Sequence, residues 1–530
     1  MPTSADHPAP NLWGPLKTPA FRNLLIADIV SDVGAFMQTV GAAWLMVSLN
    51  AGPMYVALTQ TAAALPFFLF ALPAGAIGDI VDRRKLILVT ETWMVLVALF
   101  LAGLTLAGVM SPVMLLILTF ALSAGDAFES PTWRAVLPEL VPKKDLAAAS
   151  ALNGIEFNFA RAIGPALAGI LIAAAGVGTA FLVNAASFIG VLIVIARWKR
   201  AVHKRTTPRE TVTGAMIAGI RYIRYSPAIR ALIFRSGCVM FFASALLALL
   251  PSISHNVKDS PVVYGLVLGC FGLGAVLGGV LLQPVRARLS TEGVVSGGVI
   301  VFGLSSAATG SLHTLPALSV AILIGGAAWI VFISLFNVFI LNLTPDWVRA
   351  RVLAVFMLVF QGAVAAGSAV WGALAGRIGI HNVLLLAGVG TIATAVAGLL
   401  LQLPKLSIDV TPWIPWPMPR IVNGAEATDA DDIGPILVTA EYDVIPEKTS
   451  EFLDAMHKYG RIRRRDGALR WGVFRDLESE SRYIESFIVH SWAEHLRQHE
   501  RLTQADREIE EQLRSYVRSE PTVRHLVSAK

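Results

Sequence analysis

The sequence predicts an all-α polytopic membrane protein with twelve transmembrane helices in two six-helix halves, followed by a small C-terminal α+β domain of the ferredoxin-like type. The chain has 530 residues, of which 55% are hydrophobic and only 15% charged, and this is too apolar for a soluble protein of that size. Stretches with few or no charges, each about 20 residues long as a bilayer-crossing helix requires, recur throughout residues 21–403. A strongly basic segment, residues 197–230, divides these stretches six and six, as in membrane proteins built from two repeats.

The distribution of cations predicts the orientation of the chain. Nearly all cations before residue 405 lie in alternate loops, and the loops expected outside contain only Lys258 and Arg377 as strong cations. The positive-inside rule therefore predicts a multi-pass protein of the plasma or inner membrane with both termini in the cytoplasm. Residues 1–17 lack the pattern of a removable signal peptide. The expected parts are a cytoplasmic N-terminus (1–20), an N-terminal six-helix half (21–196), a basic cytoplasmic linker (197–230), a C-terminal six-helix half (231–403), a proline-rich and then acidic linker (404–434) and a cytoplasmic ferredoxin-like domain (435–530).

A short charged loop is expected between the second and third apolar stretches, in residues 73–86. It reads PAGAIGDIVDRRKL, so that two glycines and two aspartates precede three consecutive cations. The cations place this loop on the cytoplasmic side. The spacing Gly-x-x-Gly-Asp-x-x-Asp-Arg-Arg-Lys resembles the loop signature of the major facilitator superfamily, in the form seen in its enterobactin-exporter-like, transmembrane secretion effector branch. The matching residues are Gly75, Gly78, Asp79, Asp82, Arg83 and Arg84.

This resemblance implies a conformational lock on the cytoplasmic side. In the superfamily the loop arginine docks on an acidic residue at the end of the fourth span, which is expected at residues 113–136. By resemblance, Arg83 takes this role with either Asp126 or Glu129. The run Phe-Glu-x-Pro-x-Trp that begins at residue 128, and residues 344–351 between the tenth and eleventh spans, also resemble this branch.

Ionisable and polar side chains inside the spans predict a cavity for protons and substrate. Asp28 and Asp32 lie on one side of the first span, and Arg161 lies deep in the fifth. A charge inside a bilayer is costly unless it is paired, so we expect Arg161 to pair with Asp32, with Glu156 or Asp28 as the alternatives. The expected cavity residues are Asp28, Asp32, Gln38, Asn158, Arg161 and Gln361.

Acidic residues are divided unequally between the two halves. The second half has no acidic residue well inside a span, whereas the first half has several. Proton coupling is therefore expected in the N-terminal half. Glu91 lies about two turns from Lys85, and two roles stay open for it, extension toward the headgroups or a functional role inside the span.

The fifth span contains a second motif, formed by Gly164, Pro165 and Gly169. It resembles the exporter motif of the superfamily, which implies a bend and close packing against the other half. The full motif has a Gly-Gly pair after Gly-Pro, and here only Gly169 remains of that pair. The alternative interpretation is a general packing seam of small residues.

The composition becomes that of a soluble domain from residue 435 onward. Strands are expected at 436–442, 469–475, 483–489 and 522–526, and helices at 446–459 and 492–518. This order predicts a ferredoxin-like domain, and it is similar to the small dimeric barrel family that includes antibiotic-biosynthesis monooxygenases. His495 and His499 have the i, i+4 spacing of a metal pair, but no Glu or Cys completes a known pattern. We therefore expect surface histidines and no metal.

The resemblance implies an exporter of a small organic molecule, such as a siderophore, drug or metabolite, that works by alternating access. The sequence has no Gly-x-x-x-x-Gly-Lys-Ser/Thr loop for a nucleotide, so proton-coupled antiport is the expected energy source, with neither a cofactor nor an enzyme activity. The expected partners are the lipid bilayer, the substrate and protons, with self-association through the C-terminal domain and no nucleic acid. The alternatives are a passive facilitator and a membrane-tethered enzyme or sensor acting through residues 435–530.

Overall fold

The computed structural model describes residues 12–198, 212–400, 409–411, 413 and 433–528. The start of the predicted N-terminus, residues 199–211 of the basic linker and nearly all of the predicted linker 404–434 lie outside these residues. The chain forms two compact units. The first consists of Met1–Thr206, Phe234–Phe336 and Met357–Gln402, and the second of Thr207–Ile233, Asn337–Phe356 and Leu403–Lys530.

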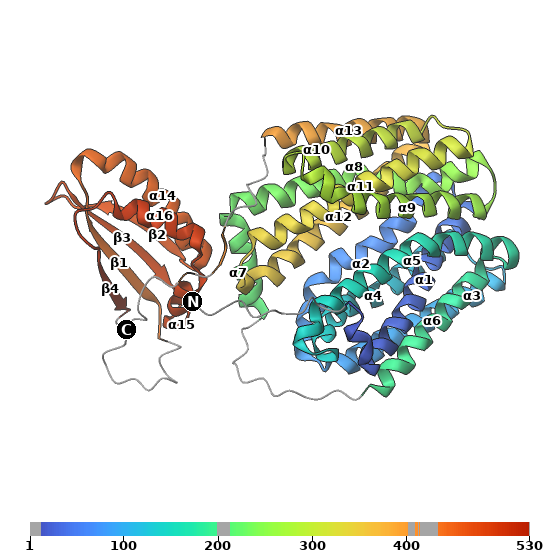
Figure 1. Ribbon diagram of the computed structural model, residues 1–530, viewed down its shortest axis with the longest axis horizontal. Helices are drawn as coiled ribbons and strands as arrows, with labels where there is room; N and C mark the ends of the chain where they lie inside the picture. The colour runs from blue at the N-terminus through green and yellow to red at the C-terminus, as the bar shows by residue number, and fades with distance from the viewer. Residues whose placement is uncertain (1–11, 199–211, 401–408, 412, 414–432, 529–530) are drawn as a thin grey trace. The chain divides into compact units, whose positions relative to one another are not determined.

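Twelve helices in the described part of the chain are long and apolar enough to cross a membrane, as the sequence predicts. Figure 1 shows them as two groups of six, α1–α6 in blue to green and α8–α13 in green to orange. The first six are α1 (Pro19–Ser48), α2 (Gly52–Ile80), α3 (Arg83–Leu106), α4 (Pro112–Leu140), α5 (Leu146–Ala175) and α6 (Val177–Arg197). The second six are α8 (Pro227–Val257), α9 (Pro261–Arg286), α10 (Thr291–Thr309), α11 (Leu315–Leu343), α12 (Asp346–Ile378) and α13 (Ile380–Leu400).

The turn between α2 and α3 is shorter than the predicted loop. Helix α2 continues to Ile80, so residues 73–80 are helical, and only Val81 and Asp82 connect the two helices. The Asp82 side chain accepts a hydrogen bond from the backbone N–H of Lys85 over 3.0 Å and caps α3. The capping aspartate, rather than the glycines before it, therefore sets the position of this turn.

Two helix pairs hold the six-helix halves together within the first unit. Helix α5 packs closely on α9, where a Cβ added to Gly169 would lie only 2.8 Å from the carbonyl oxygen of Pro261. Helix α2 packs on α12, where the Thr61 hydroxyl donates to the carbonyl of Ala365 over 3.0 Å. Small residues allow this approach because membrane helices associate by close van der Waals contact.

The C-terminal domain has the predicted ferredoxin-like order of strands and helices. Its four strands are antiparallel in the order β2-β3-β1-β4, and side chains alternate along the central strand β1 between a buried and a partly exposed face. The buried face packs on the helices through Tyr442, Phe452, Tyr459 and Phe487, all at most 6% exposed. The elements are β1 (Ile436–Asp443), α14 (Thr449–Asp466), β2 (Arg470–Arg475), β3 (Arg482–Val489), α15 (Trp492–Arg501), α16 (Gln504–Arg514) and β4 (Thr522–Val527).

The long helix expected at residues 492–518 is in fact two helices, α15 and α16. The chain leaves the first helix at Leu502, which has extended backbone angles. The second helix then begins with a capping box, in which Asp506 accepts hydrogen bonds from the backbone N–H of Thr503 over 2.9 Å and from its hydroxyl over 2.8 Å. The sequence Thr-x-x-Asp carries this signal, and the helical periodicity on both sides of it conceals the break.

Part of the predicted basic linker forms a helix, α7 (Val212–Tyr225), which packs on the C-terminal domain inside the second unit. Arg221 of α7 donates to Glu494 of α15 over 3.0 Å. The next side chain, Tyr222, lies edge-on to the indole of Trp347 at the start of α12. The guanidinium of Arg501 lies over the same indole, 4.5 Å from its centroid. Ionic and aromatic contacts therefore join α7, α12 and α15 in one unit.

Candidate functional site

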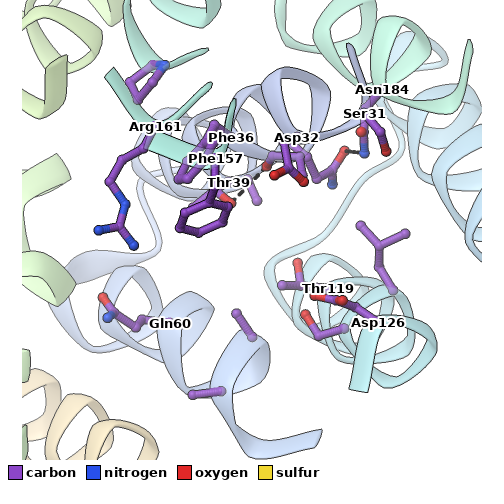
Figure 2. A pocket seen from close by; sticks show the side chains of 18 of the residues that line it. Ser31, Asp32, Phe36, Thr39, Gln60, Thr119, Asp126, Phe157, Arg161 and Asn184 are labelled. Atoms are coloured by element: carbon purple, nitrogen blue, oxygen red, sulfur yellow. Dashed lines mark hydrogen bonds between the residues drawn. The ribbon is translucent and has the colours of Figure 1, made fainter. Parts of the chain in front are cut away.

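A cavity of about 800 Å³ lies in the first unit, between the two six-helix halves. Its walls come from α1–α6 of the first half and from α8, α9, α11 and α12 of the second. A volume of this size suits a small organic molecule. Figure 2 shows part of its lining.

The cavity wall carries six carboxyl groups, and all of them come from the N-terminal half, as the unequal distribution of acids predicts. Glu91 is one of them: it is 3% exposed and lines the cavity, which decides for the second of the two roles left open for it. Glu129 accepts a hydrogen bond from the hydroxyl of Thr90 over 2.5 Å. The six are Asp28, Asp32, Glu91, Asp126, Glu129 and Glu156.

Four of these carboxyl groups are hydrogen-bonded in two pairs. The side chain of Asp32 on α1 bonds to that of Glu156 on α5. The side chain of Glu91 on α3 bonds to that of Glu129 on α4. An ionised carboxylate can only accept hydrogen bonds, so such a bond forms only when one member of the pair carries a proton. The cavity wall therefore contains two carboxyl pairs, each between two helices, that are suited to holding a proton.

Arg161 does not pair with Asp32, and this prediction is wrong for the present conformation. Its guanidinium lies 4.9 Å from the ring centroid of Phe157, and the described residues include no ion pair to it. Figure 2 shows Arg161 pointing away from Asp32, with the rings of Phe36 and Phe157 between them. The reason lies in α5: Glu156 and Arg161 are five residues apart, so about 140° of helix rotation separates their directions, and only Glu156 faces Asp32.

Of the remaining residues predicted to line the cavity, two do so and one does not. Gln38 and Gln361 line the cavity, the first from α1 and the second from α12. Asn158 does not belong to the lining, because its amide turns back to the carbonyl of Gly154 on its own helix, over 2.7 Å. The prediction that Asn158 lines the cavity is therefore wrong, because the rotation of α5 turns its side chain away.

The arginine lock has a different acceptor from the two predicted. Arg83 Nη1 donates to Oε1 of Glu139 over 2.8 Å, whereas Asp126 and Glu129 line the cavity. Helix α4 continues to Leu140 rather than ending near residue 136, so Glu139 is the acid in its last turn. The neighbouring Arg84 donates to two backbone carbonyls at the end of α6. Gly75, Gly78 and Asp79 lie in the last turns of α2, and their side-chain surroundings are outside the described part of the structure.

The glycines of the exporter motif lie where helices approach closely, as the resemblance implies. A Cβ on Gly164 would lie 2.7 Å from Cβ of Phe36 on α1. Gly169 faces α9 of the other half, and Pro165 lines the cavity between them. This confirms the close packing against the partner half.

Two contacts among the membrane-spanning helices were not predicted. Arg235 of α8 is 3% exposed and pairs over 2.6 Å with Glu292 in the first turn of α10. The sequence shows a cation at the start of an apolar span, but it does not show the partner of that cation, which lies 57 residues away. Trp44 of α1 packs between His255 of α8 and Tyr264 of α9, with ring centroids 5.9 and 6.5 Å away. These rings join the two halves near the end of α1, and Tyr264 also lines the cavity.

The histidines of the C-terminal domain are not all on its surface, contrary to the prediction. His495 is 2% exposed, and its Nε2 lies 3.3 Å from Nε2 of His499. The ring of His525 on β4 packs against that of His495 at a tilted angle, with centroids 4.7 Å apart. Burial lowers the pKa of His495 to about 3, with His499 and His525 adding to this effect. These imidazoles are therefore neutral parts of the domain core near pH 7.

The chain is similar to transporters in both sequence and structure. It is 23% identical over 374 residues to the multidrug efflux pump Tap of Mycolicibacterium fortuitum, covering 68% of this chain and 90% of that protein. It is also 23% identical over 371 residues to the staphyloferrin A transporter of Staphylococcus aureus, covering 68% of this chain and 90% of that protein.

Solved structures share the fold at low sequence identity. The nucleoside transporter NupG matches with a TM-score of 0.60 and 14% identity, covering 72% of this chain and 100% of that chain. A POT family transporter in complex with 5-aminolevulinic acid matches with a TM-score of 0.59 and 13% identity, covering 74% of this chain and 97% of that chain. The sequence model of the transmembrane secretion effectors matches residues 11–530. This protein therefore belongs to the transmembrane secretion effector family of multi-pass, twelve-helix membrane transporters.

Proposed function

We propose that this protein exports a small organic molecule across the cytoplasmic membrane by alternating access, in exchange for protons. The observation that carries this proposal is the close pair of Asp32 and Glu156 in the wall of the cavity between the halves, which is suited to binding and releasing a proton. The similarity to a multidrug efflux pump and to a staphyloferrin A transporter supports a drug or a siderophore as substrate.

The carboxyl pair offers a physical route for coupling. A buried carboxylate is costly inside a membrane, so the pair favours a conformation in which it holds its proton or one in which water reaches it. Loss of the proton leaves two like charges on α1 and α5, which repel each other and bias these helices apart. The membrane potential contributes about 2.3 kcal/mol per charge per 100 mV to such a cycle. The second pair, Glu91 and Glu129, joins α3 and α4 in the same way.

We infer the orientation of the chain in the membrane from the same loop cations that predict it in the sequence analysis. Arg83 and Arg84 of the first half, and Arg349 and Arg351 of the second, all lie at the helix ends that we assign to the cytoplasm. Both termini then lie in the cytoplasm. Cysteine labelling of residues at either end of the chain, in intact cells and in inverted vesicles, tests this orientation.

The C-terminal domain is proposed to mediate self-association rather than catalysis. The sheet face away from its helices carries an apolar row, in which Leu437 of β1 lies between Ile488 of β3 and Leu526 of β4 in register. On the same face, Phe474 of the edge strand β2 is 60% exposed, and Leu526 is 47% exposed. Such a face suits a second copy of the domain. Replacing Phe474 and Leu526 by Glu should then abolish chemical crosslinking between full-length chains.

Transport assays in inverted membrane vesicles test the main proposal. Uptake of a siderophore probe should require a proton gradient and should stop when a protonophore collapses it. Uptake that continues unchanged would identify the protein as a passive facilitator.

A chain truncated after Leu403 tests whether the protein is instead a tethered enzyme or sensor. Transport should survive this truncation. Loss of all transport in a correctly inserted truncated chain would favour the C-terminal domain as the active part.

A further inference from the structure

We propose that Arg161 is an anion-binding residue of the cavity and that the transported molecules carry an anionic group, such as a carboxylate or phenolate, beside an aromatic or apolar body. This inference rests on the proposed transport through the cavity and adds the substrate class to it. It starts from an imbalance among the cavity charges. The cavity wall holds six carboxyl groups and one arginine, and none of these carboxyl groups forms an ion pair with the arginine.

The partners of the acidic residues show why Arg161 remains available. Asp28 bonds to the indole of Trp133, and Asp32 bonds to Glu156. Glu91 and Glu129 bond to each other. Arg161 makes neither an ion pair nor a side-chain hydrogen bond within the described residues, although a guanidinium has five donors and stays charged. A cation without a counterion is costly inside a membrane, so this site favours an anionic ligand.

The surroundings of Arg161 are built to hold it facing the cavity. Its guanidinium lies 4.9 Å from the centroid of Phe157, and that ring packs on Phe36 with centroids 5.9 Å apart. The cation and ring attract each other, which fixes the guanidinium without neutralising it. Its donor edges stay free to bind a carboxylate with two parallel hydrogen bonds.

Arg161 also lies at the contact between the two halves. A Cβ on Gly272 of α9 would lie 2.9 Å from the carbonyl oxygen of Arg161, so the backbone of α5 touches the other half at this residue. Gln60 lies on the same side of the cavity as the guanidinium in Figure 2, and Gln361 of the second half is also part of the lining. An anion at Arg161 can therefore contact groups from both halves, which is the position from which a substrate influences their movement.

The two carboxyl pairs determine which charge the ligand can carry at the end away from Arg161. All four of their members line the cavity, and Asp32 lies on the other side of the Phe36 and Phe157 rings from Arg161 (Figure 2). An anionic group is repelled there when either pair loses its proton, and a neutral or cationic group is accepted. The expected ligand therefore has its anionic group at Arg161 and its neutral or basic part toward the carboxyl pairs.

Two xanthene dyes of similar shape and opposite charge test the inference. Fluorescein is anionic near neutral pH and rhodamine 123 is cationic, and binding of each to the purified full-length chain is measured by fluorescence polarisation without any proton gradient. The wild type should bind fluorescein, and Arg161→Gln should weaken that binding about tenfold or more while changing rhodamine 123 binding less than about twofold. Arg161→Lys should retain an intermediate affinity, because it keeps the charge but loses the bidentate geometry.

The control is Asn158→Ala, on the same helix but outside the cavity lining, and it should bind both dyes as the wild type does. Thermal unfolding in detergent establishes that each variant is folded. Unchanged fluorescein binding by a folded Arg161→Gln protein overturns the inference, and so does a wild type that does not bind fluorescein. Because no gradient is present, binding that depends on Arg161 supports the inference even where the vesicle assay shows no proton coupling.

Discussion

Arg83, the first residue of α3, donates a hydrogen bond of 2.8 Å to Glu139 in the last turn of α4. The two side chains are 14% and 25% exposed, so solvent screens their attraction only in part. The pair joins the ends of two neighbouring helices of the N-terminal half. Its partner differs from the acids that the family resemblance implies, and this defines a direct test.

Removing either member of this pair should weaken transport without preventing membrane insertion. A partly exposed ion pair contributes up to about 1 kcal/mol, so we expect Arg83→Ala and Glu139→Ala each to reduce the transport rate by roughly fivefold. The charge-swapped double variant, Arg83→Glu with Glu139→Arg, should recover part of the loss. Rates in inverted vesicles, normalised to protein in the membrane, provide the measurement. Strictly additive losses in the double variant would show that the two side chains do not act as a pair and that Arg83 serves only to orient the chain in the membrane.

Asp32 and Glu156 should act as one coupled unit in the proton cycle. Asp32→Asn imitates a permanently protonated side chain, and we expect it to make the transport rate independent of external pH and to lower coupled export by about tenfold or more. Glu156→Gln should have the same effect, and the double variant should be no worse than either single variant, because they remove one shared proton site. Transport measured from pH 6 to pH 8 gives the comparison. A single variant that keeps the wild-type pH profile would exclude this pair as the coupling site.

The contact of α5 and α9 should tolerate no side chain at Gly169. An added Cβ meets the backbone of α9 at 2.8 Å, so Gly169→Ala should destabilise the protein by about 1–3 kcal/mol and lower its thermal unfolding temperature in detergent. Gly154 on the same helix is the matched control, since nothing lies within 4 Å of an added Cβ there. Gly154→Ala should be neutral or slightly stabilising. Equal unfolding temperatures for the two variants would contradict the close packing.

Glu494 should matter far more than Arg221, although they form one ion pair. Arg221→Ala removes a contact between partly exposed groups, worth about 1 kcal/mol, and leaves Glu494 paired with Arg501 and Arg497. Glu494→Ala instead leaves Arg501, only 4% exposed, without its carboxylate partner, and this costs about 3–5 kcal/mol. Hydrogen exchange of peptides from α7 and α15 in the full-length chain should show this order.

The exposed pair of Arg507 and Glu511 provides the control for that comparison. Its members are 47% and 57% exposed, and Arg507→Ala should leave the exchange of α7 and α15 unchanged. A larger effect from Arg221→Ala than from Glu494→Ala would contradict the central position of Glu494 among three arginines.

Acidification should loosen the C-terminal domain through its buried histidines. Burial lowers the pKa of His495 to about 3 and that of His499 to about 4, whereas both titrate near 6.5 in the unfolded chain. Between these values the unfolded chain binds protons that the folded domain excludes, so stability that is complete above pH 6.5 is lost as the pH falls toward 4. Between pH 7.0 and 5.5 we expect a loss of roughly 1 kcal/mol per histidine.

Hydrogen exchange of β3 peptides, corrected for intrinsic rates, measures this loss in the full-length chain. His495→Gln should reduce the pH dependence. His457→Gln should retain it, because His457 is an exposed residue of α14. Protection of β3 that does not change between pH 7.0 and 5.5 would show that these histidines do not limit the domain's stability.

The sequence alone determined the secondary elements and the distribution of charge. Every transmembrane helix coincides with a predicted apolar stretch, because spanning a bilayer demands a long uncharged segment whatever its neighbours are. The order of the C-terminal elements follows equally from local patterns, apart from the break at Thr503. The restriction of the cavity carboxyl groups to the first half is also visible in the sequence, since the acids are absent from inside the spans of the second.

Only the tertiary structure decided which charged groups meet. Asp32 faces Glu156 rather than Arg161 because the rotation of α5 about its axis points two residues of one helix in different directions. Arg83 meets Glu139 because α4 extends one turn beyond its predicted end. His495 is buried because β4, 30 residues later in the chain, covers it. Helix rotation, helix length and contacts between distant segments are set by packing of the whole chain, and local hydrophobic periodicity leaves them undetermined.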